Sequence, residues 1–203
     1  MAWSKNQLPE LKEVEGKGGM MIVLPLAHSF GLSLGMNIAI HDGYKMILIP
    51  QPPEKLSKLL KLIKKENATF MPGVPTLWNK INQDPDSAKY KGQLNTFKAC
   101  LSGASALPLE VKKEFEETTG ALIIEGYGMS EASPLLTGGP FHKYKENTVG
   151  FPVSDTLIKI VDLEEGERIL PRCPNQSCES CGADEFQYIG EICGNGPQIM
   201  KGY

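Results

Sequence analysis

Short apolar runs alternate with amphipathic segments through the first three-quarters of the chain, and this alternation limits the possible folds more than any other feature. Strands buried on both faces form such continuous apolar runs, and helices of an α/β protein carry a periodic apolar stripe. The runs predicted as strands are residues 19–26, 44–50, 68–73, 97–103 and 121–128. The segments predicted as helices are 53–67, 74–84 and 107–120. The pattern predicts an α/β fold, a parallel sheet with helical crossovers.

The clearest helix covers residues 53–67, where Leu56, Leu59, Leu60 and Ile63 recur at helical spacing with lysines opposite. We expect its lysine face to be solvated, with peripheral contact to anionic lipid as the alternative. Between the first two strands, residues 28–43 have glycines spaced for a close-packed helix or a helix-like crossover.

The pattern changes after about residue 148, where short alternating segments and turn residues replace the helical period. We therefore expect two parts. Residues 1–148 would form a partial α/β subdomain, and 149–203 part of a small β-barrel subdomain with a cysteine-rich insertion at 171–188.

Composition excludes several classes of protein. The 203 residues carry 21 basic and 24 acidic side chains, a net charge of −3, so we expect no nucleic acid partner. No apolar run approaches the roughly 18 residues of a membrane span, and the polar start has no apolar signal core. We expect a cytoplasmic protein with no transmembrane segment, and the oligomeric state stays open.

Two loops follow strands of the expected sheet, and ligands of such sheets bind beyond the carboxyl ends of the strands. These loops begin at Ser102 and at Gly126, within "SGASALP" and "EGYGMSEASP". Glycines at 126 and 128 let a ligand approach the backbone, and Tyr127 between them can offer its ring to a flat heterocycle. The Ser130 hydroxyl can donate to a phosphate oxygen, and the Glu131 carboxylate can bind Mg²⁺. The alternative is an ordinary strand and loop with a packed tyrosine.

Five segments together resemble the adenylate-forming, or AMP-binding, superfamily and within it the long-chain fatty acid–CoA ligases (acyl-CoA synthetases). "EGYGMSEASP" resembles the family's "GYGxTE" motif, and "SGASALP" resembles its "SGGAPL" loop. The other segments, also in family order, are "LPLAHSFG" (24–31), "NTVGFPVSDTLIKIVD" (147–162) and "GEICGNGPQIMKGY" (190–203).

The resemblance implies an activity and its substrates. A ligase of this kind activates a fatty acid with ATP as an acyl-adenylate and then transfers the acyl group to CoA, with Mg²⁺ as cofactor. The partners would be fatty acid, ATP and CoA. The alternatives are a ligase that loads a carrier protein and a non-catalytic nucleotide- or acyl-binding module.

The resemblance also implies roles for individual residues. Tyr127 would stack on adenine, with Glu125, Gly126 and Gly128 around the base. The small residues Gly103, Ala104 and Ser105 would line the adenine and acyl pocket. Ser130 would contact the α-phosphate in place of the usual threonine, and Glu131 would hold Mg²⁺. His28 would lie near the carboxylate and the acyl or pantetheine channel, or would be a histidine satisfied at a helix start.

Two family features are missing from the sequence: the "PKG" phosphate loop and the "TGD" aspartate. The catalytic lysine of the family's mobile C-terminal domain is missing as well. We therefore expect a central fragment that does not adenylate a fatty acid unaided.

Cysteines form a further departure from the family pattern. Cys173, Cys178, Cys181 and Cys193 are spaced C-x4-C-x2-C-x11-C. Four thiolates can form a tetrahedral structural Zn²⁺ site. The alternatives are a loop of reduced thiols, with Cys193 in the core, or a zinc-ribbon interaction module.

Overall fold

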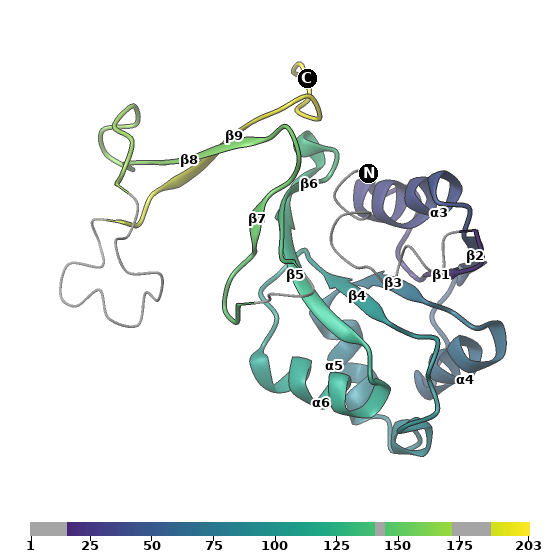
Figure 1. Cartoon of the computed structure of the whole chain (residues 1–203). Helices are drawn as coiled ribbons and strands as arrows, with labels where there is room; N and C mark the ends of the chain where they lie inside the picture. Colours follow the sequence, from purple (N-terminus) through teal and green to yellow (C-terminus); the bar gives the residue numbers. More distant parts are fainter. Residues whose placement is uncertain (1–15, 141–144, 172–187) are drawn as a thin grey trace. The chain divides into compact units, whose positions relative to one another are not determined.

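The computed structural model describes residues 16–140, 145–171 and 188–203 (Figure 1). The described residues form two compact units. The first contains the described residues up to Ser154 together with Met200–Tyr203, and the second contains those of Asp155–Ile199.

A mixed, seven-stranded sheet forms the first unit, in the order β2-β1-β3-β4-β5-β6-β7. Strands β2, β1, β3, β4 and β5 are parallel, which confirms the prediction of an α/β fold with a parallel sheet. Strands β6 and β7 continue the sheet in antiparallel register. The strands are β1 (Gly19–Ile22), β2 (Lys45–Leu48), β3 (Phe70–Gly73), β4 (Ala99–Ser102), β5 (Leu122–Gly128), β6 (Leu135–Gly138) and β7 (Phe151–Pro152).

Helices cover both faces of this sheet (Figure 1). One face carries α4 (Ser57–Glu66), α5 (Pro75–Gln83) and α6 (Leu109–Thr119), and the other carries η1 (Gly31–Asn37), a π-helix, and α3 (Ile38–His41). Alternate strand residues point to opposite faces. Met21 and Met71 therefore pack with α4, α5 and α6, whereas Met20 and Phe70 pack with η1 and α3.

The start of helix α4 lies four residues later than the sequence predicted. Residue 57 is its first helical position, so Pro53 precedes the helix instead of occupying its first turn. The Asp84 carboxylate at the end of α5 accepts a hydrogen bond from the Ser57 amide, with Oδ2 and N 2.8 Å apart. This bond satisfies one of the free amides at the helix start, and Asn67, at φ 52°, ends the helix.

Strand β2 corrects a second prediction, because it is not a buried strand. It lies at the edge of the sheet, and Met46 and Leu48 are 41% and 51% exposed. Its apolar composition resembles that of the central strands, so composition alone could not distinguish the edge from the centre.

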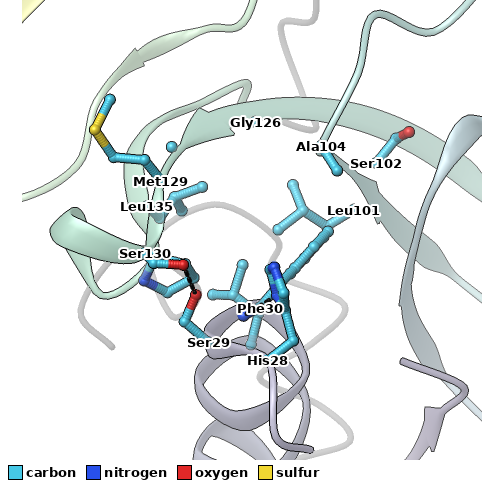
Figure 2. A pocket seen from close by; sticks show the side chains of 14 residues that line it. His28, Ser29, Phe30, Leu101, Ser102, Ala104, Gly126, Met129, Ser130 and Leu135 are labelled. Carbon is cyan, nitrogen blue, oxygen red and sulfur yellow. Dashed lines mark hydrogen bonds between the residues drawn. The ribbon is translucent and has the colours of Figure 1, made fainter. Parts of the chain in front are cut away.

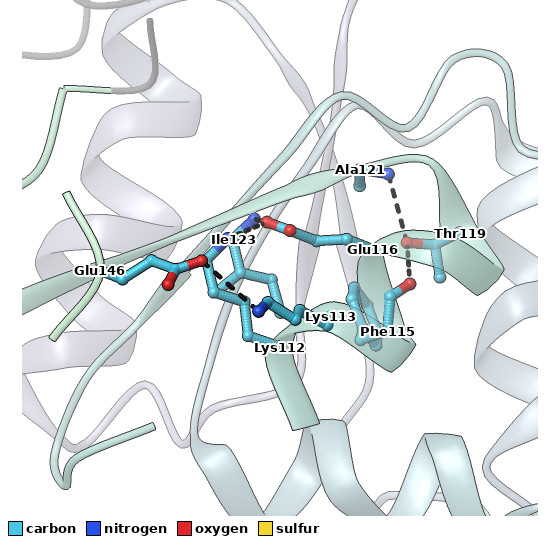
Figure 3. A network of polar contacts seen from close by, with 8 residues as sticks. All are labelled: Lys112, Lys113, Phe115, Glu116, Thr119, Ala121, Ile123 and Glu146. Atoms are coloured by element: carbon cyan, nitrogen blue, oxygen red, sulfur yellow. Dashed lines mark hydrogen bonds and ion pairs between the residues drawn. The ribbon is translucent and has the colours of Figure 1, made fainter. Parts of the chain in front are cut away.

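A network of polar contacts fixes α6 to the sheet (Figure 3). The Glu116 carboxylate accepts hydrogen bonds from the Lys112 ammonium group at 2.5 Å and from the Ile123 amide of β5 at 2.7 Å. Thr119 donates to the Phe115 carbonyl and accepts from the Ala121 amide. These bonds hold the chain as it leaves α6 and enters β5, the strand that leads to the candidate site.

The second unit contains strands β8 (Leu157–Val161) and β9 (Glu191–Asn195), which pair in antiparallel register. An isolated bridge joins Val161 to Ile169. Antiparallel strands are thus present in the region where the helical period ends.

Candidate functional site

The carboxyl ends of the neighbouring strands β4 and β5 lie side by side, and the loops that leave these ends form the candidate site. Ser102 ends β4 and Gly128 ends β5. The loops that follow contain most of the residues that the sequence analysis selected. Two cavities adjoin these loops.

The first cavity has a volume of about 240 Å³ and is lined by the loop after β1, the end of β4 and the turn after β5 (Figure 2). Its apolar wall includes Phe30, Leu34, Leu101 and Leu135. Polar side chains in its lining come from His28, Ser29 and Ser130, whereas the hydroxyl of Ser102 points away from the cavity (Figure 2). The cavity therefore suits an apolar ligand that ends in a polar or charged group.

Ser29 and Ser130 meet in the lining of this cavity, with their hydroxyl oxygens 3.3 Å apart (Figure 2). Ser130 belongs to the short helix η3 (Ser130–Ala132), and Ser29 precedes η1. The sequence analysis did not select Ser29. Its position beside His28, in a segment already selected, was the available signal.

His28 lines the first cavity, and its side chain is exposed. Its Nδ1 accepts a hydrogen bond from the Phe30 amide at 3.1 Å. In a neutral imidazole the proton is then on Nε2, so Nε2 is a donor.

The second cavity, of about 520 Å³, lies between the loop after β4, the end of β5 and residues 147–149. Tyr127, half-buried, and Ser105, exposed, both line it. Three residues, Ala104, Gly126 and Gly128, line both cavities. The two cavities therefore adjoin at a wall that has no side chain larger than a methyl group.

Glu125 holds the loop after β4 in place. Its side chain is buried, with 8% of the residue exposed, and its Oε2 accepts a hydrogen bond from the Leu107 amide at 3.0 Å. This bond joins β5 to the loop that carries Gly103, Ala104 and Ser105. Ala104 in that loop has a φ of 72°, in the left-handed region that non-glycine residues adopt infrequently.

Gly128 is required by close packing of the turn after β5. A Cβ atom at this position would lie 1.8 Å from the Pro134 carbonyl oxygen. Only glycine allows β5 and the start of β6 to approach in this way.

Glu131, the predicted magnesium ligand, follows Ser130 but does not line either of these two cavities. Its Oε1 accepts a hydrogen bond from the Tyr203 hydroxyl at 2.5 Å, and its carbonyl oxygen accepts one from the Met200 amide at 2.8 Å. The hydrogen bond from Tyr203 lowers the pKa of Glu131 below its usual value. The carboxylate is therefore charged at neutral pH.

The predicted zinc ligands are divided between described and undescribed parts of the chain. Cys173, Cys178 and Cys181 lie outside the described residues. Cys193 lies in β9, opposite Lys159, and is half-buried. Among the described residues, no group of three or more His, Cys, Asp and Glu side chains is arranged to hold a metal ion.

The described part of the chain also contains no helix long and apolar enough to cross a membrane.

The structure thus gathers most predicted site residues around two adjoining cavities. His28, Gly103 and Ser130 line the first, Ser105, Glu125 and Tyr127 line the second, and Ala104, Gly126 and Gly128 line both. Glu131 is next to this group, whereas Cys193 belongs to the other unit.

A family model described as "AMP-binding enzyme" matches residues 2–203. The chain belongs to the family of AMP-binding enzymes. Two bacterial relatives are named long-chain-fatty-acid–CoA ligase. The protein from Bacillus subtilis (strain 168) is 38% identical and the one from Escherichia coli O157:H7 is 29% identical. The alignments cover 93% and 100% of this AMP-binding chain but 30% and 35% of the relatives. The chain spans about a third of their length.

Solved structures of similar fold include apo MatB from Rhodopseudomonas palustris, with a TM-score of 0.77 and 26% identity over 100% of this chain and 36% of that one. A long-chain-fatty-acid-CoA ligase from Archaeoglobus fulgidus has a TM-score of 0.75 and 22% identity. That likeness covers 96% of this AMP-binding chain and 38% of the other, and it concerns the fold.

Proposed function

We propose that this AMP-binding chain is part of an ATP-dependent long-chain fatty acid–CoA ligase. The observation that carries the proposal is the pair of cavities that adjoin at Ala104, Gly126 and Gly128. An enzyme that joins a fatty acid to AMP needs an apolar site and a nucleotide site that meet. The names of the relatives from B. subtilis and E. coli support the same reaction.

The fatty acid would occupy the first cavity. Its hydrocarbon chain would lie against Phe30, Leu34 and Leu101, which bury apolar surface without leaving a polar group unpaired. The carboxylate would lie toward the polar end of this cavity, where Nε2 of His28 can donate a hydrogen bond to it.

The nucleotide would occupy the second cavity. The half-buried ring of Tyr127 would stack on adenine, and the small residues Gly126 and Ala104 would let the base and sugar approach the backbone. The Ser130 hydroxyl, near the junction, would donate to an α-phosphate oxygen.

The reaction follows from this arrangement. A carboxylate oxygen of the fatty acid attacks the α-phosphorus of ATP, and pyrophosphate leaves with the electron pair of the broken P–O bond. The CoA thiolate then attacks the acyl carbon, and AMP leaves. In this scheme the chain's residues bind both partners and hold them in line, which is the main requirement of phosphoryl-type transfer.

Glu131 fits a Mg²⁺ ion that arrives with ATP. Protein sites commonly offer such an ion one or two carboxylates, and phosphate oxygens and water complete its shell. The ionised Glu131 carboxylate, one residue from the Ser130 hydroxyl, can supply one ligand. The ion would neutralise negative charge on the phosphates, and Tyr203 would have to share or release Oε1.

Calorimetric titration of the chain with AMP tests the nucleotide site. We expect binding that Tyr127→Ala weakens by about ten- to hundredfold, because loss of base stacking removes roughly 1–3 kcal/mol. Tyr127→Phe keeps the ring and is the matched control, so it should retain most of the affinity. Equal affinities of the unaltered chain and Tyr127→Ala would contradict the assignment of adenine to the second cavity.

ATP–pyrophosphate exchange in the protein expressed from its full reading frame tests the reaction. Exchange that depends on a long-chain fatty acid, and not on acetate, is the expected result. Nucleotide binding without exchange would favour the non-catalytic module. Transfer to a carrier protein but not to CoA would favour the carrier-loading ligase.

For the cysteine segment we propose a structural Zn²⁺ site made by Cys173, Cys178, Cys181 and Cys193. The sequence spacing supports it, because four thiolates complete a closed tetrahedral shell. Metal analysis of protein purified without chelator should find about one zinc per chain, and Cys178→Ser should lower that content. Protein without zinc or iron would contradict this assignment.

A further inference from the structure

The hydroxyl of Ser29 lies beside the predicted phosphate-contacting hydroxyl although the two residues are 101 positions apart in the sequence. Ser29 comes from the loop after β1, and Ser130 comes from the turn after β5. Their oxygens are 3.3 Å apart, and both residues line the first cavity (Figure 2). Two hydroxyl groups from separate parts of the cavity wall therefore lie next to each other.

The backbone around Ser29 is held from both sides. The His28 amide donates to the Pro25 carbonyl at 3.1 Å, and the Phe30 amide donates to Nδ1 of His28. Phe30, 8% exposed, packs into the core against the sheet. At Gly31 a Cβ atom would lie 2.4 Å from the Pro25 carbonyl oxygen, so the turn is closely packed. The position of Ser29 is therefore fixed before any ligand binds.

Two hydroxyls at this distance can share one hydrogen between them, which leaves the second hydrogen available. An anionic oxygen placed beside both can accept from both, because each hydroxyl can rotate away from the other. Hydrogen bonds to an ionised acceptor are stronger than the bond between two neutral hydroxyls, so the exchange is favourable.

We infer that Ser29 is a second hydroxyl donor which, together with Ser130, binds the anionic oxygen of the ligand at the polar end of the first cavity. The inference rests on the proposed function. The oxygen has two possible sources, the phosphate of the nucleotide and the carboxylate of the fatty acid. Both present a charged oxygen to the same pair of donors.

Calorimetric titration of Ser29→Ala separates these sources. If the phosphate is the ligand, AMP affinity falls about tenfold, whereas adenosine, which has no phosphate, binds as before. If the carboxylate is the ligand, octanoate affinity falls about tenfold while octanol affinity does not change. Ser29→Thr keeps a hydroxyl and should retain most of the affinity that Ser29→Ala loses. A purely structural role of Ser29 in packing would not produce this difference between the two variants.

Ser33→Ala is the matched control. It removes a hydroxyl from η1 that does not line the first cavity, and it should leave all four affinities unchanged. The urea midpoint of each variant shows whether it is folded. Should Ser29→Ala unfold, the comparison of Ser29→Thr with Ser29→Cys makes the same test, because the thiol is a weak donor.

The two proposals fail in different ways. If the unaltered chain binds AMP or octanoate and Ser29→Ala binds them equally well, the inference about Ser29 is wrong and the proposed function stands. If the unaltered chain binds neither ligand, the proposed function is wrong and the role of Ser29 is refuted with it.

Discussion

The hydroxyl of Tyr203 lies 2.5 Å from Oε1 of Glu131, and this hydrogen bond joins residue 203 to the turn after β5 that carries the predicted magnesium ligand. The Met200 amide binds the carbonyl oxygen of the same glutamate. Glu131 is therefore held through its backbone and its side chain by one four-residue segment. The position of its carboxylate depends on residues far away in the sequence.

Tyr203→Phe should raise the pKa of Glu131 toward the ordinary glutamate value. The Tyr203 hydroxyl is the largest cause of the lowered pKa, and the same bond raises the pKa of Tyr203. Because the folded-state pKa of Glu131 is depressed, the bond stabilises the fold above the ordinary glutamate pKa. That contribution is lost as pH falls through the lowered value. NMR titration of the Glu131 carboxyl carbon measures the change, and an identical titration in the variant would contradict the assigned cause.

Asp84→Ala should destabilise the first unit by about 1 kcal/mol, because the carboxylate caps the start of α4 from another helix. Oδ2 accepts from the Ser57 amide and Oδ1 accepts from the Asp86 amide. The Ser57 bond is the first cause of the lowered pKa of Asp84, so its stabilisation is present above the ordinary aspartate pKa and is lost in acid.

Urea unfolding between pH 7 and pH 3 measures this loss, and Asp84→Asn should show a weaker pH dependence than the unaltered chain. Asp86→Ala, which removes a surface ion pair with Lys89, is the control and should have a much smaller effect at neutral pH.

Gly150→Ala should disrupt the pairing of β6 with β7, whereas Gly92→Ala should not. Both glycines have positive φ, 85° and 70°, so alanine is strained at either position. A Cβ at Gly150 would also lie 2.2 Å from the Gly138 carbonyl carbon, but at Gly92 it would meet nothing within 4 Å. We expect Gly150→Ala to lose roughly 1–3 kcal/mol more in free energy of unfolding. If urea unfolding shows the same loss in free energy of unfolding for both variants, the β6–β7 region accommodates the alanine by a small shift and the prediction is wrong.

Ser102→Ala should cost about 1–3 kcal/mol, since it leaves a buried donor without its acceptor. The indole Nε1 of fully buried Trp78 donates to Ser102 Oγ at 3.0 Å. In a double-mutant cycle, combining Ser102→Ala with Trp78→Phe should cost less than the sum of the two single changes. Ser105→Ala, on the exposed part of the same loop, should change stability by less than about 0.5 kcal/mol. If the losses in free energy of unfolding of the two single variants add up to that of the double variant, the hydrogen bond between Trp78 and Ser102 contributes no coupling energy and the prediction is wrong.

The parallel part of the fold could be predicted because local periodicity specifies it. The buried residues Leu59, Leu60 and Ile63 of α4 recur with a helical period. The runs around Met20, Phe70 and Ile123 are apolar on both faces of the sheet. The two loops selected as ligand-binding follow from the same topology, because carboxyl ends of neighbouring parallel strands lie together.

Strand β6 and the contacts of the site could not be predicted in this way. Its four residues, the last of them Gly138, lie between Pro134 and the dipeptide Gly139-Pro140, and four residues are too few for a period to appear. The Ser29–Ser130 and Glu125–Leu107 contacts join segments brought together by the whole sheet. A local sequence pattern does not specify how far apart two loops lie when they follow different strands. These hydrogen-bond partners could therefore be identified only from the three-dimensional structure.

The wall shared by the two cavities consists of backbone and one methyl group at Ala104, Gly126 and Gly128. A single compound with a planar ring at one end and a hydrocarbon tail at the other can therefore pass across it without displacing a bulky group. Tethering the two halves makes the second binding event intramolecular, so such a compound should bind far more tightly than either half alone. An inhibitor designed for this chain would place its shortest, least branched linker at that crossing point.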